Sequence, residues 1–110
     1  MAFDEDLADR VRELVAHESG FAERRMFGGV AMMLGGNMAV VVRGKGGLMV
    51  RVDPAASETL RSEPGVEATV MRGRPLQGWL TVDPSACATD AALKEWVDRG
   101  VAFTRGLPPK

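Results

Sequence analysis

Two side chains in this sequence could do catalytic chemistry, and they stand far apart in the chain. His17 is the sole histidine and Cys87 the sole cysteine. Catalysis by a histidine requires a nucleophile or an orienting acid close to it in space, and the predicted place of His17 in the last turn of a helix gives it a simpler electrostatic role. Cys87 precedes a predicted helix whose start could lower the pKa of a thiol, but we favour a small, packed loop residue.

The remaining sequence offers no paired acids, catalytic triad or set of metal-binding residues. A zinc site built on cysteine would need more than one of them. We therefore predict that the protein is not an enzyme and that it holds no cofactor and no metal.

Two glycine-rich segments could bind phosphate. Gly44-Lys45-Gly46-Gly47 contains a lysine, but a phosphate-binding loop needs Ser or Thr after the lysine and then a helix start. An apolar strand pattern follows instead, so we predict a tight hairpin. Gly28-Gly29 could let a phosphate approach the backbone, but we favour a bulge or a close approach of another backbone, because no helix start follows.

The best candidate for a binding surface is basic. Residues 1–23 carry seven acids and two bases, whereas residues 24–74 carry eight bases and four acids. These two parts could attract each other within the fold, or they could leave a basic face for an acidic partner. A scattered set of solvated charges is the alternative. The side chains that could contact phosphates or other anions are Arg24, Arg25, Arg43, Lys45, Arg72 and Arg74, with Arg51 as a further candidate.

Apolar periodicity and turn residues predict the elements that would position these side chains. Residues 4–18 have helical spacing, Asp53-Pro54 is typical of a helix start, and a third helix should begin at Thr89 or Asp90. Short apolar segments closed by glycines predict five strands, the first beginning near Arg24. The strands are centred on residues 26–34, 38–42, 48–52, 66–71 and 78–82, with a basic loop at residues 72–75.

The predicted order is αβββαββα. Hairpins connect the strands before the second helix, so we predict an α+β fold with a five-stranded, mostly antiparallel sheet and three helices on one side. One domain should span residues 3–107, followed by a C-terminal tail of residues 108–110.

The first two predicted strands are apolar on both faces, which requires both faces to be covered. Three short helices cover one face, so the other needs a curled sheet or a partner, such as a second copy of the chain. Trp79 and Trp96 could form a stacking platform, but their spacing favours packing in the core.

Several features taken together resemble the TfoX/Sxy N-terminal domain family. They are Arg25 followed by the motif Met26-Phe27-Gly28-Gly29, an apolar hairpin, a strand that runs through Asp53 into a short helix, a strand containing Trp79, and a last helix containing Trp96. The resemblance covers almost the whole chain and is closest to standalone members that consist of this domain alone. It implies an α+β fold, an association with the regulation of natural competence, and no established catalytic residues.

The chain lacks the apolar stretches of a signal peptide or a membrane span, so we expect a cytoplasmic protein without a membrane partner. Our first prediction of function is a non-enzymatic regulatory or protein-interaction domain that binds a protein partner or itself. The alternative is a nucleic-acid-binding protein that uses the basic sheet and the Arg72–Arg74 loop. A small ligand-binding protein or enzyme ranks third.

Overall fold

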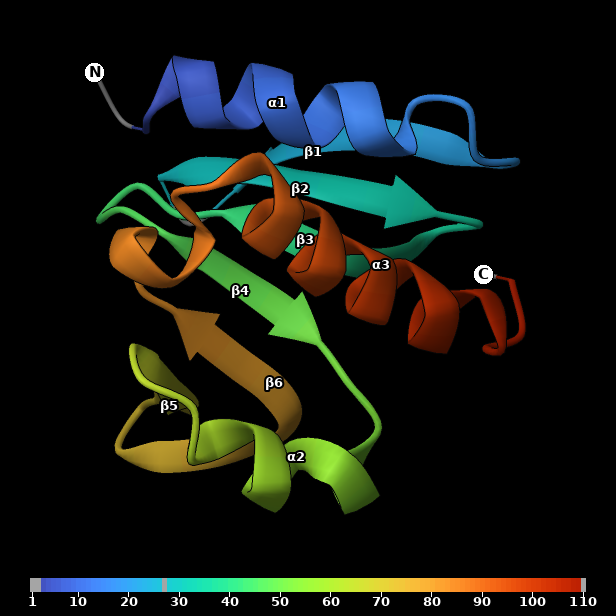
Figure 1. Cartoon of the computed structure of the whole chain (residues 1–110). Helices are drawn as coiled ribbons and strands as arrows, with labels where there is room; N and C mark the ends of the chain where they lie inside the picture. The colour runs from blue at the N-terminus through green and yellow to red at the C-terminus, as the bar shows by residue number, and fades with distance from the viewer. Residues whose placement is uncertain (1–2, 27, 110) are drawn as a thin grey trace.

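A computed structural model describes residues 3–26 and 28–109 of the chain. Over these residues the chain forms three α-helices, one short 3-10 helix and six strands (Figure 1). The helices are α1 (Glu5–Val15), α2 (Pro54–Arg61), α3 (Asp90–Arg105) and the 3-10 helix η1 (Pro84–Cys87). The strands are β1 (Phe21–Met26), β2 (Gly29–Leu34), β3 (Asn37–Val42), β4 (Leu48–Arg51), β5 (Val66–Met71) and β6 (Arg74–Val82).

The strands form one sheet in the order β1-β2-β3-β4-β6-β5, and every neighbouring pair is antiparallel. The α+β class, the antiparallel sheet and the order of the predicted elements are confirmed. The predicted strand count was wrong, because the sheet has six strands and not five over the residues described.

The additional strand is β1, which the sequence hides because its residues are charged. The predicted first strand is divided: β1 ends at Met26, β2 begins at Gly29, and these two residues face each other in the register. β1 is an exposed edge strand whose middle carries Glu23, Arg24 and Arg25. No apolar alternation marks such a strand, and its pairing with the buried β2 makes it part of the sheet.

The predicted hairpins are confirmed at both glycine-rich turns of the meander. Gly35 and Gly36 connect β2 to β3 and have φ angles of +58° and +85°, as a two-residue turn matched to the twist of the strands requires. Gly44-Lys45-Gly46-Gly47 connects β3 to β4 without forming a helix. The last strand was predicted over residues 78–82, after a basic loop at residues 72–75. Both predictions were wrong in their bounds, because β6 already begins at Arg74.

Side-chain caps start the helices close to the predicted positions. Asp53 accepts a hydrogen bond from the Ala55 N–H at 2.9 Å, and Thr89 accepts one from the Ala92 N–H at 3.1 Å. α1 ends at Val15, three residues earlier than predicted, and His17 therefore follows the helix. The reason is tertiary, since Phe21 must pair with Leu34 and the chain has to reverse before it.

All three helices cover the same face of the sheet. α1 packs on β2 and α3, while α3 crosses β2, β3 and β4 (Figure 1). α2 packs on β5 and β6, and its Leu60 contacts the same core. The core between helices and sheet includes Val11 from α1, Trp96 from α3 and Leu80 from β6. Pro108, placed in the predicted tail, accepts a hydrogen bond from Asn37 Nδ2 at 3.0 Å.

A charged pair fastens α1 to the edge strand β1. Arg12 Nη2 donates to Glu23 Oε1 at 2.8 Å, and Arg12 Nε donates to the other carboxylate oxygen. The hydrogen bonds from Arg12 lower the pKa of Glu23 below its ordinary value of 4.5. The ionised carboxylate is therefore favoured by folding.

Glu23→Gln should lower the free energy of unfolding at pH 7 by a few tenths to about 1 kcal/mol, as for partly exposed ion pairs. A carboxylate whose pKa is depressed by folding stabilises the fold above its unfolded pKa, and this contribution is lost as the pH falls through the folded pKa. The gap between wild type and variant should narrow as the pH falls below about 4.5 and close below the folded pKa of Glu23. Urea unfolding at pH 7 and at pH 3, monitored by tryptophan fluorescence, measures this difference in the free energy of unfolding. A gap that stays constant with pH would exclude this pair as its origin.

Candidate functional site

A second apolar cluster lies on the face of the sheet that the helices leave uncovered. Its buried members are Ala31, Met33, Val41, Met49 and Trp79, and the partly buried Met26, Met38 and Leu76 pack against them. Trp79 is 9% exposed and Met49 is 7% exposed. The prediction that these strands are buried on both faces is confirmed.

The curvature of the sheet covers much of this second cluster. β3 and β5 stand three strand spacings apart in the order of the sheet, which is about 14 Å if a sheet is flat. Nevertheless Val41 of β3 and Val70 of β5 line one pocket. Register shifts beside Thr69, together with a φ of +81° at Gly78, let the β5–β6 hairpin bend (Figure 1). The curled sheet, one of the two predicted alternatives, is therefore present.

The pocket between the β3–β4 turn and β5 is the candidate site. Its volume is about 220 Å³. It is open to solvent and combines apolar, hydroxyl and cationic side chains. It is lined by Val41, Arg43, Gly44, Lys45, Met49, Thr69, Val70 and Thr81.

The two threonines of the pocket form a hydroxyl pair. Thr69 Oγ1 and Thr81 Oγ1 are 3.0 Å apart, and Thr69 is 4% exposed. One hydroxyl donates to the other, so the pair has a second proton that can be donated to an outside acceptor. The pair therefore offers a hydrogen-bond donor beside the apolar side chains of Val41 and Met49.

Two cations flank the pocket from the β3–β4 turn. The half-buried Arg43 donates from Nη1 to the Gly46 carbonyl at 3.3 Å, which holds the guanidinium against the turn. Lys45 is exposed. Arg43 also lines a separate hollow of about 160 Å³ together with Glu67 and Asp83. Lys45 does not line that hollow, so it adds positive charge to the candidate site alone.

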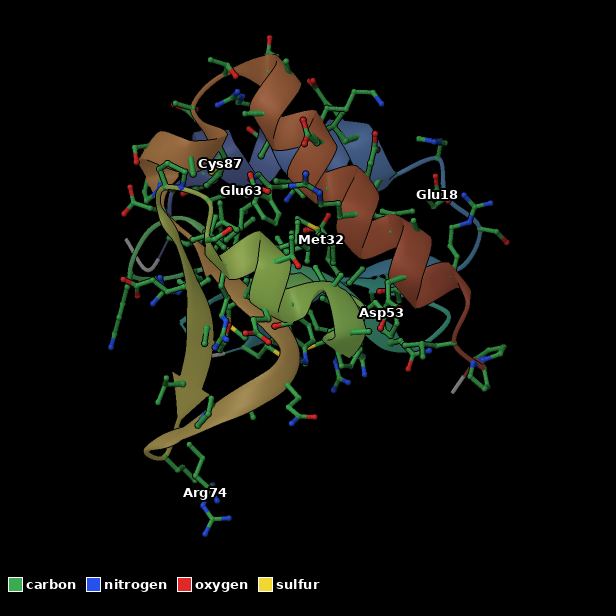
Figure 2. The ribbon with its side chains drawn as sticks, turned by 60° about the horizontal axis from the view of Figure 1, so that its bottom comes forward. Glu18, Met32, Asp53, Glu63, Arg74 and Cys87 are labelled. Carbon is green, nitrogen blue, oxygen red and sulfur yellow. The ribbon has the colours of Figure 1, made fainter. Side chains whose placement is uncertain are left out.

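The structure separates the six predicted anion-contacting residues into three places. Arg24 and Arg25 lie on the edge strand β1, and Arg25 lies over the Phe3 ring at 5.2 Å. Arg72 and Arg74 lie at the turn between β5 and β6, near the opposite edge. Arg74 projects from the tip of that hairpin (Figure 2). Only Arg43 and Lys45 meet at the pocket.

The residues of the family motif have structural contacts. Met26 packs against the second apolar cluster. A Cβ atom added to Gly29 would lie 2.0 Å from the Val42 carbonyl oxygen. The predicted close approach of another backbone is thus confirmed at Gly29, whereas the predicted bulge is replaced by the start of β2. Gly28 has a φ of +74°, and Phe27 lies outside the described residues.

Both tryptophans pack in the interior, as predicted from their spacing. Trp96 is 3% exposed in the helical core, and the Arg99 guanidinium lies 4.3 Å from its ring. Trp79 belongs to the second cluster, and Arg51 covers its ring at 5.4 Å. The Arg51 guanidinium thus shields the Trp79 ring from solvent through a cation–π contact.

Neither of the two candidate catalytic side chains, Cys87 and His17, lines the candidate pocket. Cys87 is 1% exposed, and burial raises the pKa of its thiol, which confirms the packing interpretation. The side chain of His17 is 72% exposed and lies 3.1 Å from the Glu18 carboxylate. Within the described part of the chain, no three His, Cys, Asp or Glu side chains are grouped as a metal site would need.

Sequence reasoning missed Thr69, Val70 and Thr81 as members of the site. Thr69 and Thr81 lie in different strands, and only the register of β5 on β6 brings their hydroxyls together. In the sequence, Val70 is one of several apolar residues in a predicted strand, and nothing distinguishes it from the others. Its 60% exposure follows from the bend of the hairpin, which no local pattern reveals.

Comparison with known proteins gave one match. The family model described as the TfoX N-terminal domain matches residues 13–104, from the last turn of α1 to the last turn of α3. Searches of curated proteins and of solved structures found no match. Among the helices that the structure describes, none has the length and apolar character needed to cross a membrane.

Proposed function

The chain belongs to the TfoX N-terminal domain family, and on that premise we propose that it is a non-enzymatic regulatory module that binds an extended protein segment. The family points to a competence-regulator-like domain. The segment would lie along β5 and over the pocket on the helix-free face.

The observation that carries this proposal is the exposure of Val70. Within the described residues, it is the large hydrophobic side chain that remains exposed, at 60%. It lies on an edge strand and also lines the pocket. Burial of a valine side chain contributes roughly 1.5–3 kcal/mol. A partner that covers Val70 would therefore gain a useful part of its binding free energy there.

The two edges of the sheet differ in a way that favours β5. Edge strands offer unpaired backbone N–H and C=O groups, and proteins often protect them with charged side chains. β1 carries Glu23, Arg24 and Arg25 in its middle, whereas β5 has the sequence VEATVM with a single charge. An extended segment can add to such an edge by main-chain hydrogen bonds and place alternate side chains in a neighbouring pocket.

Val70→Gln, which replaces the exposed apolar side chain without adding a charge to the pocket, should weaken binding of such a segment at least tenfold, which corresponds to about 1.4 kcal/mol. Random peptides displayed on phage with their C-termini free would be selected on the wild-type domain, and the affinities of selected peptides would be measured by fluorescence anisotropy. Ala102→Gln is the matched control, because it introduces the same side chain at an exposed position of α3. Peptides that bind both variants equally well would contradict the proposal.

The partner could also be a second copy of the chain, as the doubly apolar strands predicted. Light scattering at micromolar concentration distinguishes this case. A dimer that dissociates in Val70→Gln would show that a second copy of the chain covers Val70 of β5. A monomer would count against self-association and leave a different protein as the partner.

The second candidate function is nucleic-acid binding, favoured by the projecting tip with Arg72 and Arg74 (Figure 2). With two cations there, binding should weaken with salt at a slope of no more than about two released counterions. Anisotropy with mixed-sequence DNA and RNA from low to physiological salt measures it. The Arg72→Ala, Arg74→Ala double variant should lose the binding, and unchanged binding would exclude the tip.

A further inference from the structure

We infer that the pocket holds the free C-terminal residue of the bound segment, with the terminal carboxylate on Arg43 and Lys45 and an apolar side chain against Val41 and Met49. This inference rests on the proposed function and names the kind of segment that the domain recognises. The evidence is the size of the pocket, its charge and the closeness of its apolar and polar parts.

The size of the pocket fits one residue. A cavity of about 150 Å³ holds benzene, and pockets for larger ligands range from about 300 to 1,000 Å³. The volume of about 220 Å³ lies between these values. It suits a branched apolar side chain together with the carboxylate attached to the same Cα atom.

The chemistry of the lining requires an anion and an apolar group in the same small unit. Arg43 and Lys45 supply positive charge, and the Thr69–Thr81 pair supplies a hydroxyl proton. Met49 and Val41 provide apolar surface within the same pocket. An aspartate side chain or a phosphate ester would satisfy the cations and leave the apolar walls uncovered. A terminal valine, leucine or isoleucine satisfies both parts.

Two acids near Arg43 reduce the positive electrostatic potential that attracts a ligand carboxylate. Glu67 and Asp83 share the neighbouring hollow with Arg43. The Asp83 carboxylate accepts hydrogen bonds from the Ser85 N–H at 3.0 Å and the Ser85 hydroxyl at 2.6 Å, and these bonds lower its pKa. Asp83 therefore keeps its charge and competes for Arg43, so Lys45 should supply more of the attraction for the ligand.

The experiment uses the full chain with isotope-labelled backbone amides and Val, Met and Thr methyl groups. The probe is an acetylated peptide of four alanines followed by valine, prepared as the free acid and as the C-terminal amide. We expect the acid to shift the signals of Val41, Met49, Thr69 and Val70, with the amide at least tenfold weaker. Lys45→Met should reduce the affinity for the acid severalfold and leave that for the amide unchanged.

The Thr69→Val, Thr81→Val double variant removes both hydroxyls at nearly constant volume and should also weaken binding of the acid selectively, because either hydroxyl alone keeps a proton to donate. Equal affinities for the acid and the amide would overturn the inference that the pocket recognises a C-terminal carboxylate. Signal shifts only outside the pocket, or no shifts at millimolar peptide, would overturn it as well. If N-acetylvaline binds as tightly as the peptide, the ligand of the pocket is a small carboxylic acid and not a peptide terminus, which also overturns the inference. The proposed function fails separately, when selected peptides bind wild type and Val70→Gln equally.

Discussion

Gly47→Ala should lower the free energy of unfolding by about 3–5 kcal/mol, a large part of the stability of a domain of this size. Two causes act together at this position. Gly47 has a φ of +72°, where an L-residue with a Cβ atom costs roughly 1–2 kcal/mol. In addition, the new Cβ atom would lie 2.1 Å from the Val82 carbonyl oxygen, so backbone would have to move.

The matched control is Gly73→Ala, which separates the two causes. Gly73 has a similar φ of +77°, but an added Cβ would meet nothing within 4 Å. Gly73→Ala should therefore cost only about 1 kcal/mol. Urea unfolding followed by tryptophan fluorescence gives both values. Equal losses in the two variants would show that the approach of β6 to Gly47 has no energetic importance.

Trp96→Ala should destabilise the fold by about 3–5 kcal/mol, the range for removal of a large buried aromatic side chain. The ring is 3% exposed in the core between α3 and the sheet, so its loss leaves a cavity. The Arg99 guanidinium, 4.3 Å from the ring, loses its aromatic contact as well. Denaturant unfolding followed by far-ultraviolet circular dichroism measures the change without relying on the removed fluorophore.

Trp79→Ala on the opposite face tests whether the second apolar cluster is a core in its own right. Trp79 is 9% exposed beneath Arg51, and it packs with Met33 and Met49. We expect a loss of at least 2 kcal/mol if this face is packed as a core. A loss below 1 kcal/mol would mean that the curled sheet leaves it effectively at the surface, and the helix-free face would then be a larger apolar target than the pocket.

These variants also separate the stability of the candidate site from its chemistry. Gly47 closes the turn that carries Arg43 and Lys45, so its substitution should disturb the pocket indirectly. Lys45→Met, by contrast, changes an exposed side chain and should leave stability within about 0.5 kcal/mol. A loss of binding in Lys45→Met therefore reports on recognition, whereas a loss in Gly47→Ala reports on folding.

The sequence by itself determined most of the secondary structure. Asp53-Pro54 and Thr89 start helices because short polar side chains accept hydrogen bonds from free N–H groups of the first turn. Gly35-Gly36 makes a hairpin because both residues adopt positive φ angles. The apolar strands β2 and β3 could also be predicted, since they depend on residues that are close in the chain, and the family resemblance needs only the order of its motifs along the sequence.

Only the tertiary structure decided β1, the curl of the sheet and the candidate site. β1 is a strand because β2 offers it backbone partners, although its charged residues have no strand pattern of their own. The six candidate anion-contacting residues lie in three places, two at opposite edges of the sheet and one at the pocket, because strand order depends on long-range pairing. Thr69 meets Thr81 through the register of β5 on β6, and Arg43, Lys45 and Val70 line one pocket through the bend of the β5–β6 hairpin. Such contacts arise from packing between residues distant in sequence, which local periodicity does not encode.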